Sequence, residues 1–395
     1  INGAANFGPL YPVLRYDFMR TVISVDRPFH AALLANSLAN QGSSVEIYTS
    51  APRRFFKRLS ESVQTHLVPS PLQIAGHLLK RAPPRTLASL DTGFFDLTVS
   101  AVMGRPDLYI GWASEALFAA RHAKKHGGAF VLDRACPHRD FQESLVERES
   151  ERLGVAYHPQ AKWFRERQLE EYELADAILV PSEYTARSFP EPLRRKLIKA
   201  PLLGRCSEPK VVRKERNATF TVGVVGGSPI RKGYLYLLKA WQMLALPNAK
   251  LLLRSGDLTH FPALSELLSS IPNVEFVDYV PDISDFYQRC DVFVLPSIDD
   301  GFGMALVEAM LNGRACIATS NTGASELMTS GQNGVVIDAA DEDQLAAALL
   351  RFYEDEGFRA EMGAAAAVRA REIAASGLYD QAIHSLLRET RRSID

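Results

Sequence analysis

Two carboxylates flank a glycine-rich turn in the stretch 290–310, which reads CDVFVLPSIDDGFGMALVEAM. Asp300 precedes the turn, and Glu308 follows it in a predicted helix. Gly301 and Gly303 allow backbone angles that other residues resist, so bare amides can approach a ligand closely. Amides at a helix start lack internal partners and carry the positive end of the helix dipole, which suits phosphate or sugar oxygens. The stretch therefore predicts a ligand site with an acid on either side.

A second glycine turn lies earlier in the chain, in the sequence VVGGSPIRKG that begins at Val224. Gly226 and Gly227 end a predicted strand, and Arg231 and Lys232 precede the next helix. Two cations beside such a turn can neutralise a diphosphate without a metal. An ordinary solvated helix start with basic residues would explain the same pattern. The turn lacks both the G-x-G-x-x-G spacing and the P-loop sequence, which disfavours a Rossmann dehydrogenase or an NTPase.

A histidine in the amino-terminal half is a further candidate. The sequence AFVLDRACPHRD places Asp133 at a strand end and His138 in the following loop. A loop histidine that faces a cleft can form a hydrogen bond with a hydroxyl of a bound ligand or with a charge that develops during a reaction. The alternative is a histidine that caps the helix predicted over residues 139–149.

Strands that alternate with helices must position these residues. The segments that read as strands are TVISVD, SSVEIYTS, PDLYIGW, AFVLD and ADAILVPS, followed after a charged linker (204–218) by FTVGVVGG, AKLLLRSGD, VEFVDYV, DVFVLPS, RACIATS and GVVID. Such alternation predicts parallel sheets covered by helices, here in two doubly wound domains that face a cleft. Ligands of such sheets bind at the carboxyl ends of the strands, where both glycine turns fall.

The order of these motifs resembles that of a known family. The turn GGSPIRKG, then PSIDDGFGMALVEAM and then NTGASEL resemble the carboxyl half of the family 4 retaining glycosyltransferases of the GT-B fold, the glycosyl transferases group 1. The resemblance covers the chain from about Thr21 and is most specific over residues 221–338. It implies two Rossmann-like α/β domains and transfer of a sugar, with retention, from a nucleotide-diphosphate sugar to an acceptor hydroxyl.

The resemblance also assigns roles. In the family a Glu-x7-Glu motif holds the donor: the first acid, here Asp300, faces the sugar, and the second, here Glu308, binds the ribose. The family usually has an arginine where this chain has Gly227, so Arg231 supplies that charge. The predicted catalytic residues are His138, Arg231, Lys232 and Asp300. The predicted donor-binding residues are Gly226, Gly227, Tyr279, Val280, Gly301, Phe302, Gly303, Met304 and Glu308, with the loop at Tyr279 placed against the nucleobase.

The implied mechanism needs no cofactor and no metal, because the nucleotide-diphosphate sugar is a co-substrate and the leaving phosphate takes the acceptor proton. Two enzymatic alternatives on the same fold are a nucleotide-sugar epimerase and a phosphorylase. They need an additional acid/base set or a pyridoxal-bound lysine, and the sequence indicates neither. A non-catalytic nucleotide-sugar-binding protein is the third alternative.

The domain prediction follows the same resemblance. We expect an acceptor-binding domain over residues 19–205, a nucleotide-sugar-binding domain over 206–375, and a helix over 376–395 that crosses back to the first domain. Residues 1–18 show no clear period and read either as an upstream extension or as an ordinary edge segment. The acceptor is expected to be a glycan or a lipid-linked precursor.

The length and composition of the chain limit the classes of protein to which it can belong. A chain of 395 residues accommodates two to three domains at about 150 residues each. Its net charge of −1 gives no general attraction to nucleic acid. The four cysteines form no C-x-x-C pair, so neither a zinc site nor a disulfide framework is indicated. No apolar run approaches the roughly 18 residues of a spanning helix, and we expect a cytoplasmic protein, peripheral at most to the inner face of the membrane.

One segment is strongly basic. Residues 51–90 contain seven Lys or Arg residues and a single acid, Glu61. The sequence RRFFKR places two aromatic residues among the cations Arg53, Arg54, Lys57 and Arg58. This composition suits an anionic membrane surface or a phosphate-bearing acceptor. A basic loop pair that only solubilises this face is the alternative.

Overall fold

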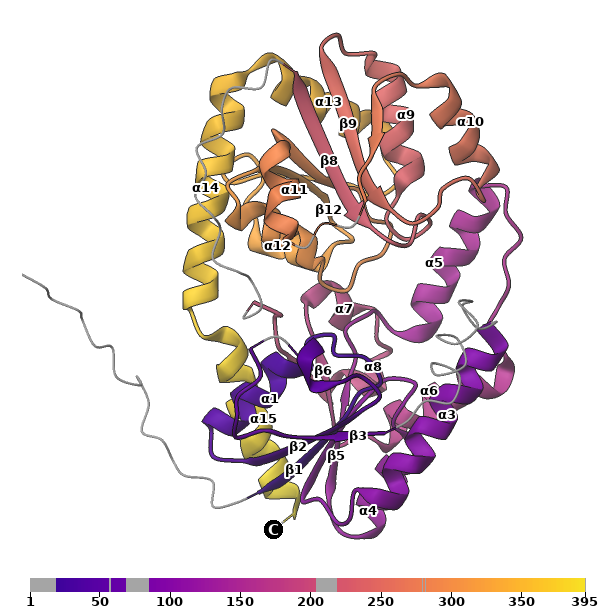
Figure 1. Ribbon diagram of the computed structural model, residues 1–395, viewed down its shortest axis with the longest axis vertical. Coiled ribbons are helices and arrows are strands. Elements are labelled where there is room, and N and C mark those ends of the chain that lie inside the picture. Colours follow the sequence, from indigo (N-terminus) through magenta and orange to yellow (C-terminus); the bar gives the residue numbers. More distant parts are fainter. Residues whose placement is uncertain are drawn as a thin grey trace, which may run out of the picture. The chain divides into compact units, whose positions relative to one another are not determined.

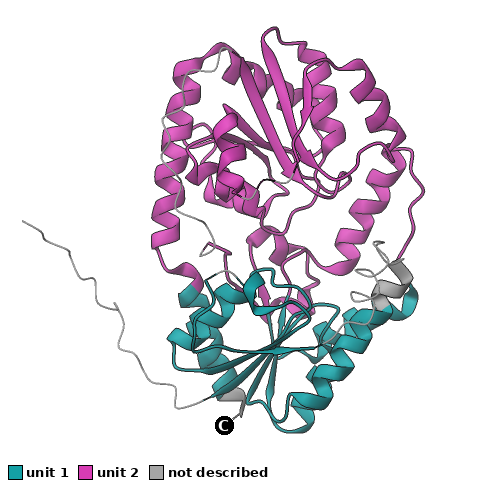
Figure 2. Ribbon diagram, in the orientation of Figure 1, with its two compact units in different colours: residues 1–133, 161–178, 380–395 teal, residues 134–160, 179–379 magenta. Residues whose placement is uncertain are grey.

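The computed structural model describes residues 19–56, 58–68, 85–203, 219–278, 280 and 282–394. Two compact units are distinguished in Figure 2: unit 1 holds residues 1–133, 161–178 and 380–395, and unit 2 holds residues 134–160 and 179–379. Residues 1–18, which read as an extension or as an edge segment, and the predicted linker (204–218) lie outside the described residues. The predicted domain boundary at residue 205 therefore stays a prediction.

The first sheet has seven strands in the order β3-β2-β1-β4-β5-β6-β7. These strands are β1 (Arg20–Ser24), β2 (Ser44–Thr49), β3 (Gln64–Leu67), β4 (Leu108–Trp112), β5 (Ala129–Asp133), β6 (Ala177–Val180) and β7 (Leu197–Lys199). Figure 1 labels β1, β2, β3, β5 and β6 of this sheet. The pairings of β1 with β2 and with β4 are parallel, as are those of β2 with β3 and of β4 with β5. Strands β3 and β7 were not predicted, because both are short edge strands without a continuous apolar run.

Helices separate these strands in the chain. They are α1 (Ala31–Asn40), α3 (Arg85–Val102), α4 (Leu117–Lys125), α5 (Arg139–Arg152), α6 (Lys162–Leu174), α7 (Glu183–Arg187) and α8 (Glu191–Arg194), with a short 3-10 helix η1 (Arg53–Phe55). The last helix described, α15 (Leu378–Ile394), belongs to unit 1 from Asp380 onward. There the Ser37 hydroxyl of α1 donates a hydrogen bond to the Asp380 carboxylate.

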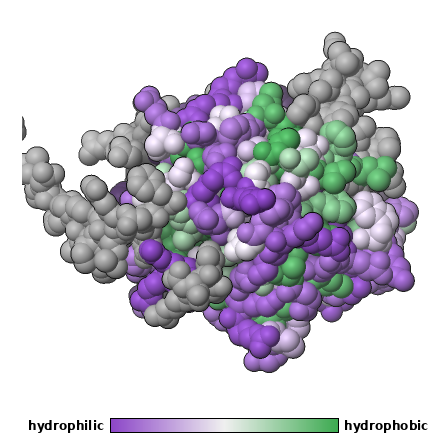
Figure 3. Space-filling model, turned by 90° about the horizontal axis from the view of Figure 1, so that it is seen from below, coloured by the Kyte–Doolittle hydropathy of each residue, from purple (hydrophilic) through white to green (hydrophobic). Residues whose placement is uncertain are grey.

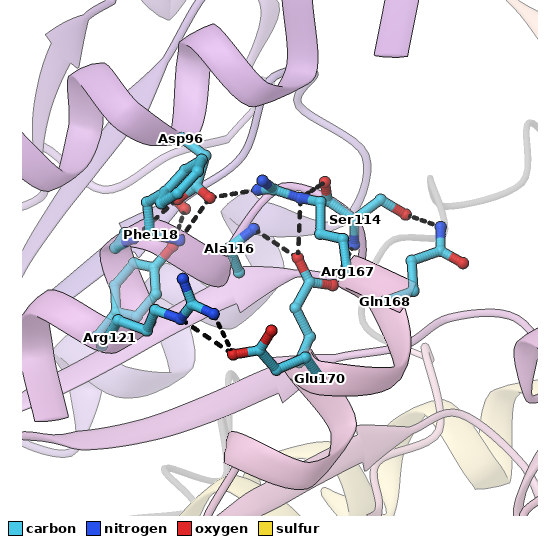
Figure 4. A network of polar contacts seen from close by, with 12 residues as sticks. Asp96, Ser114, Ala116, Phe118, Arg121, Arg167, Gln168 and Glu170 are labelled. Carbon is cyan, nitrogen blue, oxygen red and sulfur yellow. Dashed lines mark hydrogen bonds and ion pairs between the residues drawn. The ribbon is translucent and has the colours of Figure 1, made fainter. Parts of the chain in front are cut away.

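A buried polar network stabilises unit 1 (Figure 4). The fully buried Asp96 carboxylate, on α3, accepts hydrogen bonds from the amides of Phe118 (2.7 Å) and Ala119 (2.9 Å) at the start of α4. Arg167 of α6 pairs with Asp96 and lies 3.6 Å from a carboxylate oxygen of Glu171. Since one guanidinium serves two buried acids, burial dominates the titration of these acids, and it raises the pKa of Glu171 to about 7.

The second sheet lies in unit 2 and has six strands in the order β10-β9-β8-β11-β12-β13. The strands are β8 (Phe220–Gly226), β9 (Ala249–Ser255), β10 (Val274–Phe276), β11 (Val292–Leu295), β12 (Ala315–Thr319) and β13 (Val335–Ile337). All the pairings described are parallel. The four residues of β11 have no solvent exposure, as their unbroken apolar run predicted.

The helices of this second half are α9 (Tyr234–Leu244), α10 (Pro262–Ser270), α11 (Ile283–Arg289), α12 (Met304–Leu311), α13 (Glu342–Glu354) and α14 (Glu356–Ala375), with the 3-10 helix η2 (Gly323–Leu327). Helix α9 packs against α10 and α13, whereas α14 packs against α12 and β12. The two predicted parallel sheets are thus present. In the second sheet the strand order reverses between β8 and β11, which is where an open parallel sheet binds its ligand.

Candidate functional site

The two glycine turns follow the two neighbouring strands at which the strand order of the second sheet reverses. Strand β8 ends at Gly226 and β11 ends at Leu295, and the strands pair in parallel with Val292 opposite Val222. Their carboxyl ends therefore lie at the same edge of the sheet. All the residues of both turns belong to unit 2.

Backbone contacts hold the two turns together. The amides of Ile298 (2.9 Å) and Asp299 (3.2 Å) both donate to the carbonyl oxygen of Arg231. Gly233, which directly precedes α9 and has a φ of 65°, approaches the other turn so closely that a Cβ there would lie 1.9 Å from the Pro296 carbonyl oxygen. Only glycine fits this position. The RKG and DDGFG turns thus form one backbone unit.

Two adjacent ion pairs join the turns. Arg231 Nε lies 2.8 Å from Asp299, and the Lys232 ammonium pairs with Asp300. The side chains of Arg231, Lys232 and Asp300 keep 28%, 20% and 14% of their exposure, so each reaches the surface. The Asp299 side chain keeps none. The structure therefore brings together three of the four predicted catalytic residues.

Asp299 was not predicted as a site residue. It accepts hydrogen bonds from Gln142 Nε2 (2.6 Å) and from the Tyr184 hydroxyl (3.3 Å), in addition to Arg231. Burial, and then the charge of Asp299, raises the pKa of Tyr184, so the phenol remains a donor. Burial lowers the pKa of the Arg231 guanidinium. The nearby Cys136 and the carboxylates of Asp299 and Asp300 have a larger effect in the opposite direction, so this pKa is raised. The only sequence signal for Asp299 was the doubled acid in IDDG.

The two glycines at the end of β8 differ in their surroundings. A Cβ at Gly226 would lie 2.6 Å from Cγ of Lys232, so this glycine makes room for the lysine stem across the strand end. A Cβ at Gly227 would meet nothing within 4 Å. The first glycine is required by packing, whereas the second borders open space.

The acidic turn is fixed by its carbonyl groups. The Gly301 carbonyl accepts hydrogen bonds from the hydroxyls of Ser182 (2.6 Å) and Thr185 (3.0 Å). The Phe302 ring is buried and anchors the turn. Gly303, with a φ of 85°, precedes α12 and offers no side-chain cap to its first amides. A helix start without a side-chain cap leaves amides available for a ligand.

Glu308 lies on α12, one turn beyond Met304, and is partly buried. Its carboxylate accepts a hydrogen bond from the hydroxyl of Tyr287 (2.8 Å). Burial, followed by the charge of Glu308, raises the pKa of Tyr287. The second predicted acid is therefore oriented by a phenol of α11.

His138 caps a helix. Its Nδ1 accepts a hydrogen bond from the amide of Asp140 (3.3 Å) at the start of α5, and its own amide donates to the Ser188 hydroxyl (2.7 Å). The ring packs edge-on against Phe189 and is 6% exposed. The capping alternative is thus observed, and the donor contact of His138 stays a prediction.

The predicted nucleobase loop follows β10. Tyr279 lies outside the described residues, whereas Val280 is described and partly buried. The contact of this loop with a base therefore stays a prediction. Within the described ranges, no group of three or more His, Cys, Asp or Glu residues is arranged to hold a metal ion.

The site coincides with a family match. Residues 219–355 match the family described as glycosyl transferases group 1, and this segment contains both glycine turns, Asp300 and Glu308. We refer to residues 219–355 as the group 1 segment. The predicted resemblance is thereby confirmed over this group 1 segment.

A curated relative supports the assignment of the group 1 segment. The capsular polysaccharide biosynthesis glycosyltransferase CapM of Staphylococcus aureus is 29% identical over 153 residues. That match covers 37% of this chain and 40% of CapM. The chain thus matches less than half the length of this relative.

Solved structures show the fold over nearly the whole chain. Sucrose-phosphate synthase from Thermosynechococcus elongatus has a TM-score of 0.68 at 18% identity and covers 95% of this chain and 100% of its own. HepE from Anabaena, in complex with UDP-glucose, has a TM-score of 0.65 at 16% identity and covers 94% of this chain and 100% of its own. The predicted GT-B class, with two Rossmann-like parallel sheets, is confirmed.

Proposed function

We propose that this chain transfers a sugar from a nucleotide-diphosphate sugar to an acceptor hydroxyl, with retention of configuration. One observation carries the proposal: Arg231, Lys232 and Asp300 meet at the switch point of the second sheet, within the group 1 segment. Cations beside helix-start amides stabilise a diphosphate, and an adjacent carboxylate accepts hydrogen bonds from sugar hydroxyls. The complex of HepE with UDP-glucose, on a similar fold, agrees with such a donor.

Departure of the diphosphate is the difficult step of this reaction. The bond between C1 of the sugar and the phosphate oxygen breaks, and the electron pair leaves with the phosphate. Arg231, Lys232 and the first amides of α12 stabilise that developing charge without proton transfer. The acceptor oxygen then bonds to C1 from the same face, and its proton passes to the leaving phosphate. No separate base and no metal take part in this scheme.

The two acids have different tasks in this proposal. Asp300 receives the sugar hydroxyls, and Glu308, held by Tyr287, binds the ribose. Lys232 also pairs with Asp300. The incoming donor therefore replaces a lysine–aspartate pair by a lysine–phosphate contact and an aspartate–hydroxyl contact.

His138 is proposed as a donor to the sugar through Nε2. Because Nδ1 accepts the Asp140 amide, the neutral imidazole carries its proton on Nε2. That nitrogen can donate to a sugar hydroxyl or to a developing charge. The capping bond thus sets the tautomer that the proposed contact requires.

The acceptor is proposed to be a glycan or lipid-linked precursor met at the cytoplasmic face of a membrane. Arg54 lies over the exposed Phe55 ring at 5.2 Å, whereas Arg53 bonds the carbonyls of Ser60 and Val63. Exposed apolar side chains on α3 include Leu90, Phe94 and Leu97. On the face shown in Figure 3, hydrophobic areas lie among hydrophilic ones. None of the helices described is long and apolar enough to cross a membrane.

Vesicle co-sedimentation tests the membrane contact. We expect the protein to pellet with vesicles containing anionic lipid at low salt, and the substitution of Arg54 and Arg58 by Gln to reduce the bound fraction. Lys57 of the same segment lies outside the described residues. Absence of binding at low salt would leave only the solubilising role for this segment.

A donor panel tests the proposed reaction. The purified protein is incubated with UDP-, GDP- and ADP-sugars, and the products are separated by chromatography. Slow release of free nucleotide from one donor is the expected result, since water can replace the acceptor. An epimerised donor would instead indicate the epimerase, and binding without turnover the non-catalytic protein.

A further inference from the structure

We infer that Asp299 is a positioning residue that fixes the Arg231 guanidinium toward the diphosphate of the donor. This inference rests on the proposed function, because it names how one of the proposed cations is held. The Asp299 side chain is fully buried, so it acts through Arg231 and not on a ligand. Its neighbour Asp300 is partly exposed, which gives the two consecutive acids separate tasks.

Three donors from separate parts of unit 2 converge on Asp299. Arg231 Nε (2.8 Å) comes from the turn before α9, Gln142 Nε2 (2.6 Å) from α5, and the Tyr184 hydroxyl (3.3 Å) from α7. A buried carboxylate is costly unless it is paired and hydrogen-bonded. These contacts meet that requirement, and they leave the acid in one orientation.

The two neutral donors are themselves anchored. Tyr184 lies on α7, whose first amides, of Glu183 and Tyr184, donate to Glu326 at 2.9 and 2.6 Å. Gln142 lies in the first turn of α5, whose start is capped by His138. Asp299 therefore receives two hydrogen bonds from neutral donors at helix termini that are fixed independently of Arg231.

The geometry at Arg231 points to a ligand-facing cation. Asp299 takes the Nε edge of the guanidinium, while Nη2 lies 3.8 Å from the Cys136 sulfur. The side chain keeps 28% of its exposure. A guanidinium presents several donors in a rigid plane, so fixing one edge determines the direction of the others. Holding the plane before binding reduces the conformational entropy that the ligand contact would otherwise cost.

A double-mutant cycle tests the inference. The affinity of the intact protein for UDP, GDP or ADP, whichever binds the wild type best, is measured by calorimetry for Asp299→Asn, Arg231→Gln and the double variant. We expect about tenfold weaker binding for Asp299→Asn and about 30-fold for Arg231→Gln, by loss of preorganisation and of the charge contact. The double variant should bind like Arg231→Gln alone, because Asp299 acts only through Arg231.

A matched control is Glu342→Gln, which removes the Lys239–Glu342 pair (3.0 Å) elsewhere in unit 2 and should leave affinity unchanged. Gln142→Leu, which keeps the acid and removes one donor, should weaken binding about threefold and serves if Asp299→Asn does not fold. Wild-type affinity in Asp299→Asn and Gln142→Leu, or additive losses in the double variant, would overturn the inference. A wild type that binds none of the three nucleotides would overturn the proposed function as well.

Discussion

At the scale of single residues, the site depends on a glycine whose missing Cβ leaves room for the Lys232 side chain. Gly226 and Gly227 are adjacent and chemically identical, yet only the first lies against Lys232. This contrast yields a prediction with a built-in control.

Gly226→Ala should impair donor binding, whereas Gly227→Ala should not. The added Cβ at Gly226 would lie 2.6 Å from the Lys232 stem and displace the ammonium from its place beside Asp300. We expect about tenfold weaker nucleotide binding for Gly226→Ala, comparable to the loss of one charge-assisted contact. Calorimetric titration of both variants checks this. Equal affinity in the two variants would show that the position of Lys232 does not matter.

The residue scale also shows how far sequence reasoning extends. The motifs predicted Arg231, Lys232 and Asp300, and the structure brings these side chains together. Asp299 was not predicted because its partners Gln142 and Tyr184 are 157 and 115 residues away in the chain. No local spacing encodes such contacts.

At the scale of elements, the strands that support the site were predicted because they are mainly apolar and a glycine turn follows each of them. Strand β3, with the sequence QTHL, was missed because it is partly exposed and polar. The start of α5 shows a different limit: a capping histidine and a ligand-binding histidine share one sequence pattern. Only the bond from the Asp140 amide to His138 identifies the cap.

The loop between β4 and α4 gives a pH prediction. Burial raises the pKa of Glu115 from its ordinary value of 4.5 to about 8, although its carboxylate accepts the Asp26 amide at 2.9 Å. Between about pH 5 and pH 8 the folded state therefore holds a proton that the unfolded state has released. Stability falls as pH rises through this window, by up to about 1.4 kcal/mol per pH unit for such a group.

Glu115→Gln should remove this dependence, because a neutral amide replaces the protonated acid. We expect the variant to melt like the wild type near pH 5 and at a higher temperature than the wild type near pH 8. Glu170→Gln, which removes an exposed partner of Arg121, is the control. An unchanged pH slope in Glu115→Gln, measured by thermal unfolding, would contradict the assignment.

At the scale of the whole molecule, the two parallel sheets were predictable because alternation of strands and helices is a repeated signal, whereas the GT-B class was implied by the resemblance of the motifs. The same signal does not show which segments of the chain make up each compact unit. Residues 134–160 belong to unit 2, where Arg152 bonds the Tyr236 hydroxyl (2.6 Å) and Gln142 reaches Asp299. Such long-range pairs leave no trace in local periodicity.

Ligand-linked stability gives a prediction at this scale. A nucleoside diphosphate that binds only the folded protein should raise its melting temperature, by the equivalent of about 2.7 kcal/mol at a concentration 100 times Kd. UDP, GDP and ADP are compared at equal concentration, with the corresponding nucleosides as controls. Stabilisation by a nucleoside alone, equal to that by its diphosphate, would indicate that the basic turn does not bind phosphate.

The most direct test of the central claim is the rate of nucleotide release from the preferred donor in the wild type, Lys232→Ala and Glu308→Ala. Removing the cation at the diphosphate or the acid at the ribose should reduce the rate at least about 100-fold, since each loses a charge-assisted contact in a preorganised site. Lys250→Ala, which removes a β9 side chain that pairs with Glu275 of β10, should retain activity. Wild-type rates in both Lys232→Ala and Glu308→Ala would contradict the proposed site.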